Sequence, residues 1–117
     1  MWKYFEESEF ACPCCGENEI VIELVTKLDD AREYAGIPFH INSGYRCRKH
    51  NKKVGGSRLS SHKKGLAADI RAKSSSDRFH IVRGLIKAGF TRIGIGKTYI
   101  HADIDEHKPQ GIIYLYK

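Results

Sequence analysis

Apolar residues recur at intervals of three and four in two stretches of the chain, residues 18–34 and 77–88. This spacing places the apolar side chains on one face of an α-helix. Gly36 and Gly89 follow the two stretches, as glycine does where a helix ends, and Ser76 stands where a side chain can cap the start of the second. The pattern therefore predicts two amphipathic helices.

Shorter apolar or alternating stretches are typical of β-strands. The predicted strands cover residues 39–43, 66–72, 92–95, 99–104 and 112–116. The polar segment 48–61 contains Gly55-Gly56 and is expected to be a surface loop with at most one helical turn. Two helices against a mainly antiparallel sheet predict an α+β fold, in one domain spanning residues 1–117.

Composition and charge narrow the classes of partner. The 117 residues include 20 Lys and Arg against 14 Asp and Glu, and a pI near 9.2 favours an acidic partner such as cell-wall polymer, nucleic acid or anionic lipid. The basic residues are dispersed and no groove-reading motif is present, so nucleic-acid binding is not expected. No stretch is long enough to span a membrane, and Glu6 and Glu7 interrupt the region where a secretory signal would be apolar. We expect a monomer that is made in the cytoplasm without a signal peptide.

Four cysteines leave their chemistry open. Three are close together in Cys12-Pro13-Cys14-Cys15, and Cys47 is distant in sequence. This differs from the even set of a secreted disulfide framework, so reduced thiols are the first interpretation and a disulfide involving Cys47 is the second. The cluster could also be half of a structural zinc site, although the usual second Cys-x-x-Cys pair is absent.

Asp69 is the first candidate metal ligand. It lies between Ala68 and Ile70 in a predicted strand, and His62 precedes it by seven residues. An ionised carboxylate among apolar side chains loses hydration that only a cation can replace. The cation could be a metal ion or an arginine, and the solvated face of an edge strand is a further alternative for Asp69.

A second histidine favours the metal. His101 and Asp103 lie two residues apart in another predicted strand, and therefore on one face. Two imidazoles and one carboxylate, with a fourth position for water, are typical of a catalytic zinc site. The sequence thus predicts one zinc ion held by His62, Asp69 and His101.

Several segments resemble a known family. Ser60-x-His62-x-x-Gly65-x-Ala67-x-Asp69 resembles the first metal motif of the zinc D-alanyl-D-alanine carboxypeptidases and related M15-type peptidoglycan peptidases. Ser43-Gly44-Tyr45-Arg46, followed by His50-Asn51 and Val54-Gly55-Gly56, is similar to the substrate-side segment of that family, and His101 matches its last zinc ligand. The family includes the vancomycin-resistance dipeptidases and many phage endolysins.

The resemblance implies a Hedgehog/D,D-peptidase-like fold and a hydrolytic activity. The expected reaction is attack of a zinc-bound water on a peptide bond made by a D-amino acid in the stem peptide of bacterial peptidoglycan. Arg46 would stabilise the oxyanion or bind the substrate carboxylate, although an ordinary surface position is its alternative. Tyr45, His50 and Ser60 would contact the substrate. The expected place of action is the cell wall, after release of the protein, as in phage lysis.

The chain departs from this family at the position of the general base. Many members have a catalytic Glu three residues before the last histidine ligand, and here that residue is Thr98, which cannot act as a base. Asp103 is the expected substitute, either as the base or as a residue that orients a ligand. If no base is competent, the chain is a zinc-containing but non-catalytic peptidoglycan-binding or structural module. The sequence leaves these functions open, and likewise carboxypeptidase or endopeptidase action.

Overall fold

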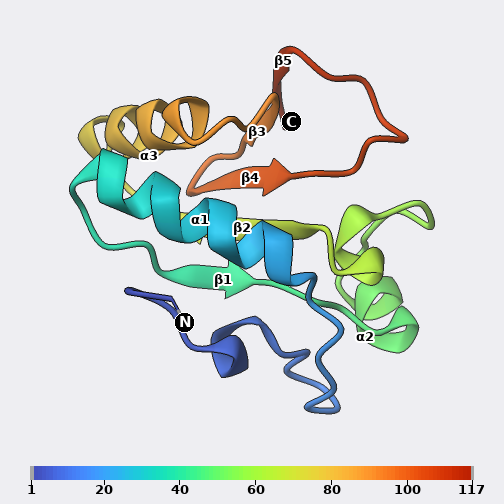
Figure 1. The fold of residues 1–117 in the computed structure, drawn as a ribbon. Coiled ribbons are helices and arrows are strands. Elements are labelled where there is room, and N and C mark those ends of the chain that lie inside the picture. Colours follow the sequence, from blue (N-terminus) through green and yellow to red (C-terminus); the bar gives the residue numbers. More distant parts are fainter. Residues whose placement is uncertain (1, 117) are drawn as a thin grey trace.

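Three α-helices, two short 3-10 helices and five strands make up the structure (Figure 1), a computed structural model in which residues 2–116 are described. In chain order the elements are η1 (Glu7–Phe10), α1 (Ile22–Ala35), β1 (Ile41–Ser43), α2 (Arg48–Lys53), η2 (Ser61–Lys64), β2 (Ala67–Arg71), α3 (Ser75–Lys87), β3 (Arg92–Ile95), β4 (Tyr99–Asp103) and β5 (Ile112–Leu115). All five predicted strands and both predicted helices are present, with bounds that differ by a few residues.

The helices agree with the sequence-based expectations at one point and differ from them at two. α1 ends at Gly36 in the left-handed conformation, as predicted. The cap of α3 is Ser74 rather than Ser76, because the Ser74 Oγ accepts the Asp77 N–H at 3.0 Å. The segment 48–61 was expected to contain at most one helical turn, whereas residues 48–53 form the helix α2. Asn51 is its one buried residue, so no apolar stripe marks it in the sequence.

The sheet has the strand order β1-β2-β4-β3-β5. β1 with β2, β2 with β4 and β3 with β4 pair antiparallel, whereas β3 with β5 pair parallel. The predicted α+β class with a mainly antiparallel sheet is therefore confirmed, and the parallel edge strand is an addition.

The core lies between the sheet and the pair α1 and α3, which run side by side (Figure 1). Their buried residues meet those of β2, β3 and β4; the fully buried members include Leu24, Leu28, Ile70, Ile81, Leu85, Ile93 and Ile100. Gly84 allows the close approach of the two helices, since a Cβ there would collide with the backbone of Ala31. The opposite face of the sheet is left for polar side chains.

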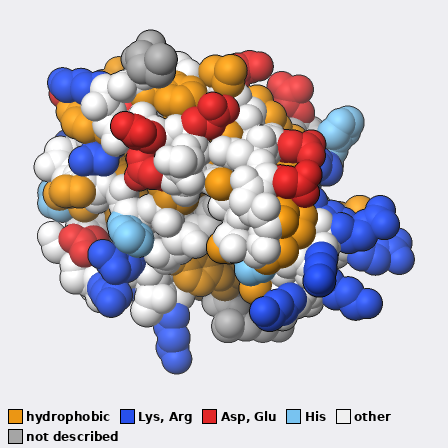
Figure 2. Space-filling model, turned by 90° about the horizontal axis from the view of Figure 1, so that it is seen from below, with side chains coloured by type: hydrophobic (Ala, Val, Ile, Leu, Met, Phe, Trp, Pro, Cys, Tyr) orange, Lys and Arg blue, Asp and Glu red, His pale blue; other side chains and the backbone are white. Residues whose placement is uncertain are grey.

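Basic side chains are spread over the molecule, and one group of them lies beside α2. Figure 2 shows Lys and Arg projecting at the side on which α2 lies in Figure 1. The exposed cations of α2 and the loop after it are Arg48, Lys49, Lys52, Lys53 and Arg58. Within residues 2–116, no helix combines the length and the apolar character needed to cross a lipid bilayer.

Candidate metal centre

The pairing of β2 with β4 sets two predicted ligands side by side. Asp69 lies directly opposite His101 in the antiparallel register. Their neighbours Ala68, Ile70 and Ile100 are in the core, so the alternation along each strand turns Asp69 and His101 to the other face of the sheet.

The third ligand, His62, comes from η2. The Ser60 side chain caps this short helix by accepting the His62 N–H at 3.2 Å. Gly65 ends it with φ at 72°, where an added Cβ would collide with the backbone of Glu19. This tight turn brings His62 over the beginning of β2.

The three predicted ligands converge on one point. One ligand atom from each of His62, Asp69 and His101 lies within 4.8 Å of the other two. The Asp69 Oδ1 is 2.9 Å from the His101 Nδ1 and 3.3 Å from the His62 Nε2. Burial alone would raise the pKa of Asp69, but the hydrogen bonds to His101 and His62 hold it below its ordinary value. Asp69 is therefore an anion facing two imidazole nitrogens.

The other nitrogen of each imidazole is also held. The His62 Nδ1 lies 2.8 Å from the carbonyl oxygen of Gly44, and the His101 Nε2 lies 2.7 Å from the Asp103 Oδ2. The carbonyl oxygen of Gly44 and the carboxylate of Asp103 accept from the nitrogens that they contact, and the nitrogens that face Asp69 can bind a cation in place of their protons. The donor set and its orientation fit a zinc ion with an open coordination position.

The candidate ligands lie in a cleft of about 520 Å³. Arg46 lines it and is held by three partners: its Nε donates to the Ser43 Oγ at 2.9 Å, its Nη1 to the Asn51 Oδ1 at 3.3 Å and its Nη2 to the Asp69 Oδ2 at 3.4 Å. Ser60 also lines the cleft. The cleft thus combines the possible metal site with a fixed guanidinium.

Comparison with family models matches residues 3–105 to peptidase M15. The chain belongs to the peptidase M15 family. The suspected family is thereby confirmed, and the matched range contains all three candidate ligands of this M15 peptidase together with Arg46. Comparison with curated proteins finds no match.

Two residues expected to contact the substrate of this M15 peptidase are not in the cleft. Tyr45 is 7% exposed, and its hydroxyl donates to the Glu19 Oε2 at 3.5 Å, away from the neighbouring Arg46. His50 lies in α2 with its Nδ1 buried and without a hydrogen-bond partner among the described residues. Neither side chain lines the cleft, so the structure does not place them for direct substrate contact.

Asp103 lies behind His101. Its carboxylate contacts the His101 nitrogen that faces away from Asp69, and it also accepts the Arg92 Nε–H at 3.1 Å. Asp103 is 1% exposed and does not line the cleft. Of the two roles open for Asp103, this position fits orientation of His101. Thr98 is exposed in the turn before β4.

Three tyrosines line the cleft, and none was predicted as a site residue: Tyr99, Tyr114 and Tyr116. The rings of Tyr114 and Tyr116 lie with their centroids 6.3 and 6.0 Å from that of His101, and their hydroxyls are 3.1 Å apart. Gly94 makes room for them, because a Cβ there would stand 2.6 Å from the Tyr116 ring. The parallel pairing of β5 with β3 brings Tyr114 and Tyr116 to the candidate metal centre.

Asp105 is a further buried residue that sequence reasoning missed. Its Oδ2 accepts the Ser61 hydroxyl at 2.8 Å and pairs with the Lys64 Nζ at 3.0 Å. Burial raises its pKa, but the bonds to Lys64 and Ser61 outweigh this, and the pKa is lowered overall. Asp105 therefore ties η2, which carries His62, to the end of β4. The alternation of Asp103, Ile104 and Asp105 was the sequence pattern that could have identified Asp105 as a buried residue.

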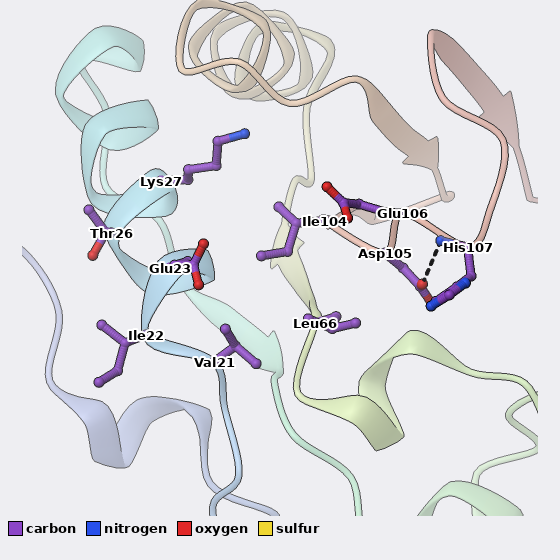
Figure 3. Close-up of a pocket in the computed structure, with 10 residues that line it drawn as sticks. All are labelled: Val21, Ile22, Glu23, Thr26, Lys27, Leu66, Ile104, Asp105, Glu106 and His107. Carbon is purple, nitrogen blue, oxygen red and sulfur yellow. Dashed lines mark hydrogen bonds between the residues drawn. The ribbon is translucent and has the colours of Figure 1, made fainter.

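A separate hollow of about 600 Å³ lies between the first turns of α1 and the segment after β4 (Figure 3). Glu23 and Lys27 reach it from α1, while Asp105 and His107 are joined there by a hydrogen bond of 3.2 Å (Figure 3). None of the three candidate ligands lines this hollow. The candidate metal centre therefore lies in the cleft with Arg46 and not in this hollow.

Proposed function

We propose that this chain is a zinc-dependent peptidase that hydrolyses a D-amino-acid peptide bond in the stem peptides of bacterial peptidoglycan. One observation carries the proposal: the ligand atoms of His62, Asp69 and His101 converge in a cleft beside the guanidinium of Arg46. Membership of the peptidase M15 family supports peptide hydrolysis. The proposed place of action is the cell wall, which the protein would reach after its release from the cytoplasm.

The chain itself supplies the ligands and their orientation. Zinc, when bound, supplies Lewis acidity that makes a water nucleophilic near neutral pH and polarises a carbonyl. The Asp103 carboxylate and the Gly44 carbonyl accept from the far nitrogens of His101 and His62, and this holds both rings with their other nitrogens toward the metal position. Both imidazoles are therefore oriented before a metal ion arrives.

Hydrogen-bond donors surround the proposed reaction centre. Arg46 is fixed by Ser43, Asn51 and Asp69, so little conformational entropy is lost when its guanidinium binds a carboxylate or a developing oxyanion. Burial raises the pKa of Tyr114 and Tyr116, so both hydroxyls remain protonated and can donate at neutral pH. We assign these three side chains to the binding of negative charge on the substrate.

The charge around the cleft supports an acidic substrate. Three cations, Arg46, Arg92 and Lys108, line the cleft. Stem peptides carry carboxylates, and a basic lining raises their local concentration. These cations support peptidoglycan as the partner.

A second function has a specific observation in its favour. Among the described residues that line the cleft, Asp69 is the only carboxylate, and it is a candidate ligand. A zinc-containing module that binds peptidoglycan without cleaving it would need no further base. The distinction between the two functions is therefore catalytic competence, not metal content.

The test is hydrolysis of defined muropeptides by the zinc-loaded protein, followed by mass spectrometry of the products. We expect a released D-amino acid or a cleaved stem peptide with the wild-type chain, and none with His62→Ala. The released fragment identifies carboxypeptidase or endopeptidase action. Intact muropeptides in the presence of stoichiometric zinc would contradict the proposal and favour the binding module.

A further inference from the structure

Four thiols from two distant parts of the chain meet outside the cleft. The sulfur atoms of Cys12, Cys14, Cys15 and Cys47 all lie within 4.8 Å of one another, and the Sγ atoms of Cys14 and Cys47 are 3.4 Å apart. In a tetrahedral zinc site with Zn–S bonds of about 2.3 Å, neighbouring sulfurs stand roughly 3.8 Å apart. The spacing of the four thiols is therefore close to that of a tetrathiolate site.

The backbone around the first three thiols is a tight turn. The Cys12 carbonyl accepts the Gly16 N–H at 2.8 Å, and the Cys12 N–H donates to the Glu17 carbonyl at 2.8 Å. Gly16 has φ at 77°, a conformation that suits glycine. The turn sets Cys12 and Cys15 at the Cys-x-x-Cys spacing of structural zinc sites, with Cys14 between them.

Cys47 completes the set from the segment after β1. It directly precedes α2, and its Sγ accepts the His50 N–H at 3.4 Å, a bond that stabilises a thiolate. A disulfide between Cys14 and Cys47 would use two of the four sulfurs and would not explain why the other two are beside them. We infer that these four cysteines form a second metal site, which binds a structural zinc ion as thiolates.

This tetrathiolate site would fix the segment that carries Arg46. Tyr45 donates its N–H to the Phe10 carbonyl at 2.8 Å, and Arg46 donates its N–H to the His62 carbonyl at 3.1 Å. Gly44 in the same segment accepts from His62. A metal on Cys47 and the Cys12 turn therefore ties the N-terminal segment to the residues that orient His62. The inference does not depend on the proposed function, because a non-catalytic module would need the same support.

The experiment is elemental analysis of metal content in four chains purified under reducing conditions. We expect two zinc ions per wild-type chain, one in Cys15→Ser, one in His62→Ala and two in the matched control Pro13→Ala, whose substitution lies in the same turn. We also expect Cys15→Ser to unfold at a lower temperature than Pro13→Ala. One zinc per wild-type chain that is lost completely in His62→Ala would overturn the inference.

A second measurement does not require a cysteine variant to fold. The His62→Ala chain, freed of metal and then given one equivalent of cobalt(II), should show the ultraviolet sulfur-to-cobalt charge-transfer absorption of thiolate ligands. Absence of this absorption, or a Cys14–Cys47 disulfide found by mass spectrometry of protein purified under reducing conditions, would also overturn it. If the wild-type chain holds both zinc ions but does not hydrolyse muropeptides, that result would contradict only the proposed function.

Discussion

The substitution Asp103→Asn tests how the metal centre is organised. The Asp103 Oδ2 contacts the His101 Nε2 and accepts from the Arg92 Nε, and its Oδ1 accepts the Asp105 N–H at 3.1 Å. Asparagine has the same shape but only one acceptor oxygen. Its amide NH₂ group must therefore face at least one of these donors inside a site that is 1% exposed.

The expected magnitude has two parts. A buried donor left without an acceptor costs about 1 to 3 kcal/mol of folding free energy. Loss of the anion behind His101 makes its other nitrogen a weaker ligand, and the loss of such a partner weakens metal binding by about 10- to 100-fold, or about 1.4 to 2.7 kcal/mol. Asp103→Asn should fold, melt at a lower temperature and bind zinc more weakly.

The assay is titration of the metal-free protein with zinc against a chelator of known affinity, with thermal unfolding measured in parallel. Glu106→Gln is the matched control, because Glu106 is exposed in the same segment, and its zinc affinity should equal that of the wild type. Unchanged zinc affinity in Asp103→Asn together with a large loss of hydrolysis would refute the reasoning. Asp103 would then act on the reacting groups directly, as a base.

Three further substitutions test the cleft and the core. Arg46→Ala should lower the turnover number by about 100- to 1,000-fold without releasing zinc, as measured with defined muropeptides, whereas the exposed Arg58→Ala should not. Gly56→Ala should also reduce turnover at unchanged zinc content, because a Cβ there would collide with the side-chain amide of Asn51, whose Oδ1 accepts from the Arg46 Nη1. Leu28→Ala, at a fully buried position of α1, should lower the free energy of unfolding by about 2 to 5 kcal/mol in urea denaturation. Ile22→Ala, at an exposed position of the same helix, should change it by less than about 0.5 kcal/mol.

The elements with a strong apolar period could be predicted, and those without one could not. α1 and α3 bury a stripe of side chains, so their sequences repeat at helical spacing. α2 buries only Asn51, and for that reason at most one helical turn was expected there. The parallel pairing of β5 with β3 was missed because strand direction within a sheet depends on the path of the chain, not on the alternation within one strand.

The sequence by itself predicted the ligand set of the candidate metal centre. Carboxylate and imidazole side chains within the apolar stretches around Asp69 and His101 are too costly to bury without a cation, and this cost is visible in the chain as written. The motif around His62 indicated the peptidase family from the same residues, and the family match confirms that family.

Only the tertiary structure decided the surroundings of these ligands. The register of β2 and β4 set Asp69 opposite His101, the parallel strand β5 brought Tyr116 beside His101, and the N-terminal turn met Cys47. These contacts join residues that are far apart in sequence, or depend on which way a strand face points. They arise from packing of the whole chain, and local patterns carry no information about them.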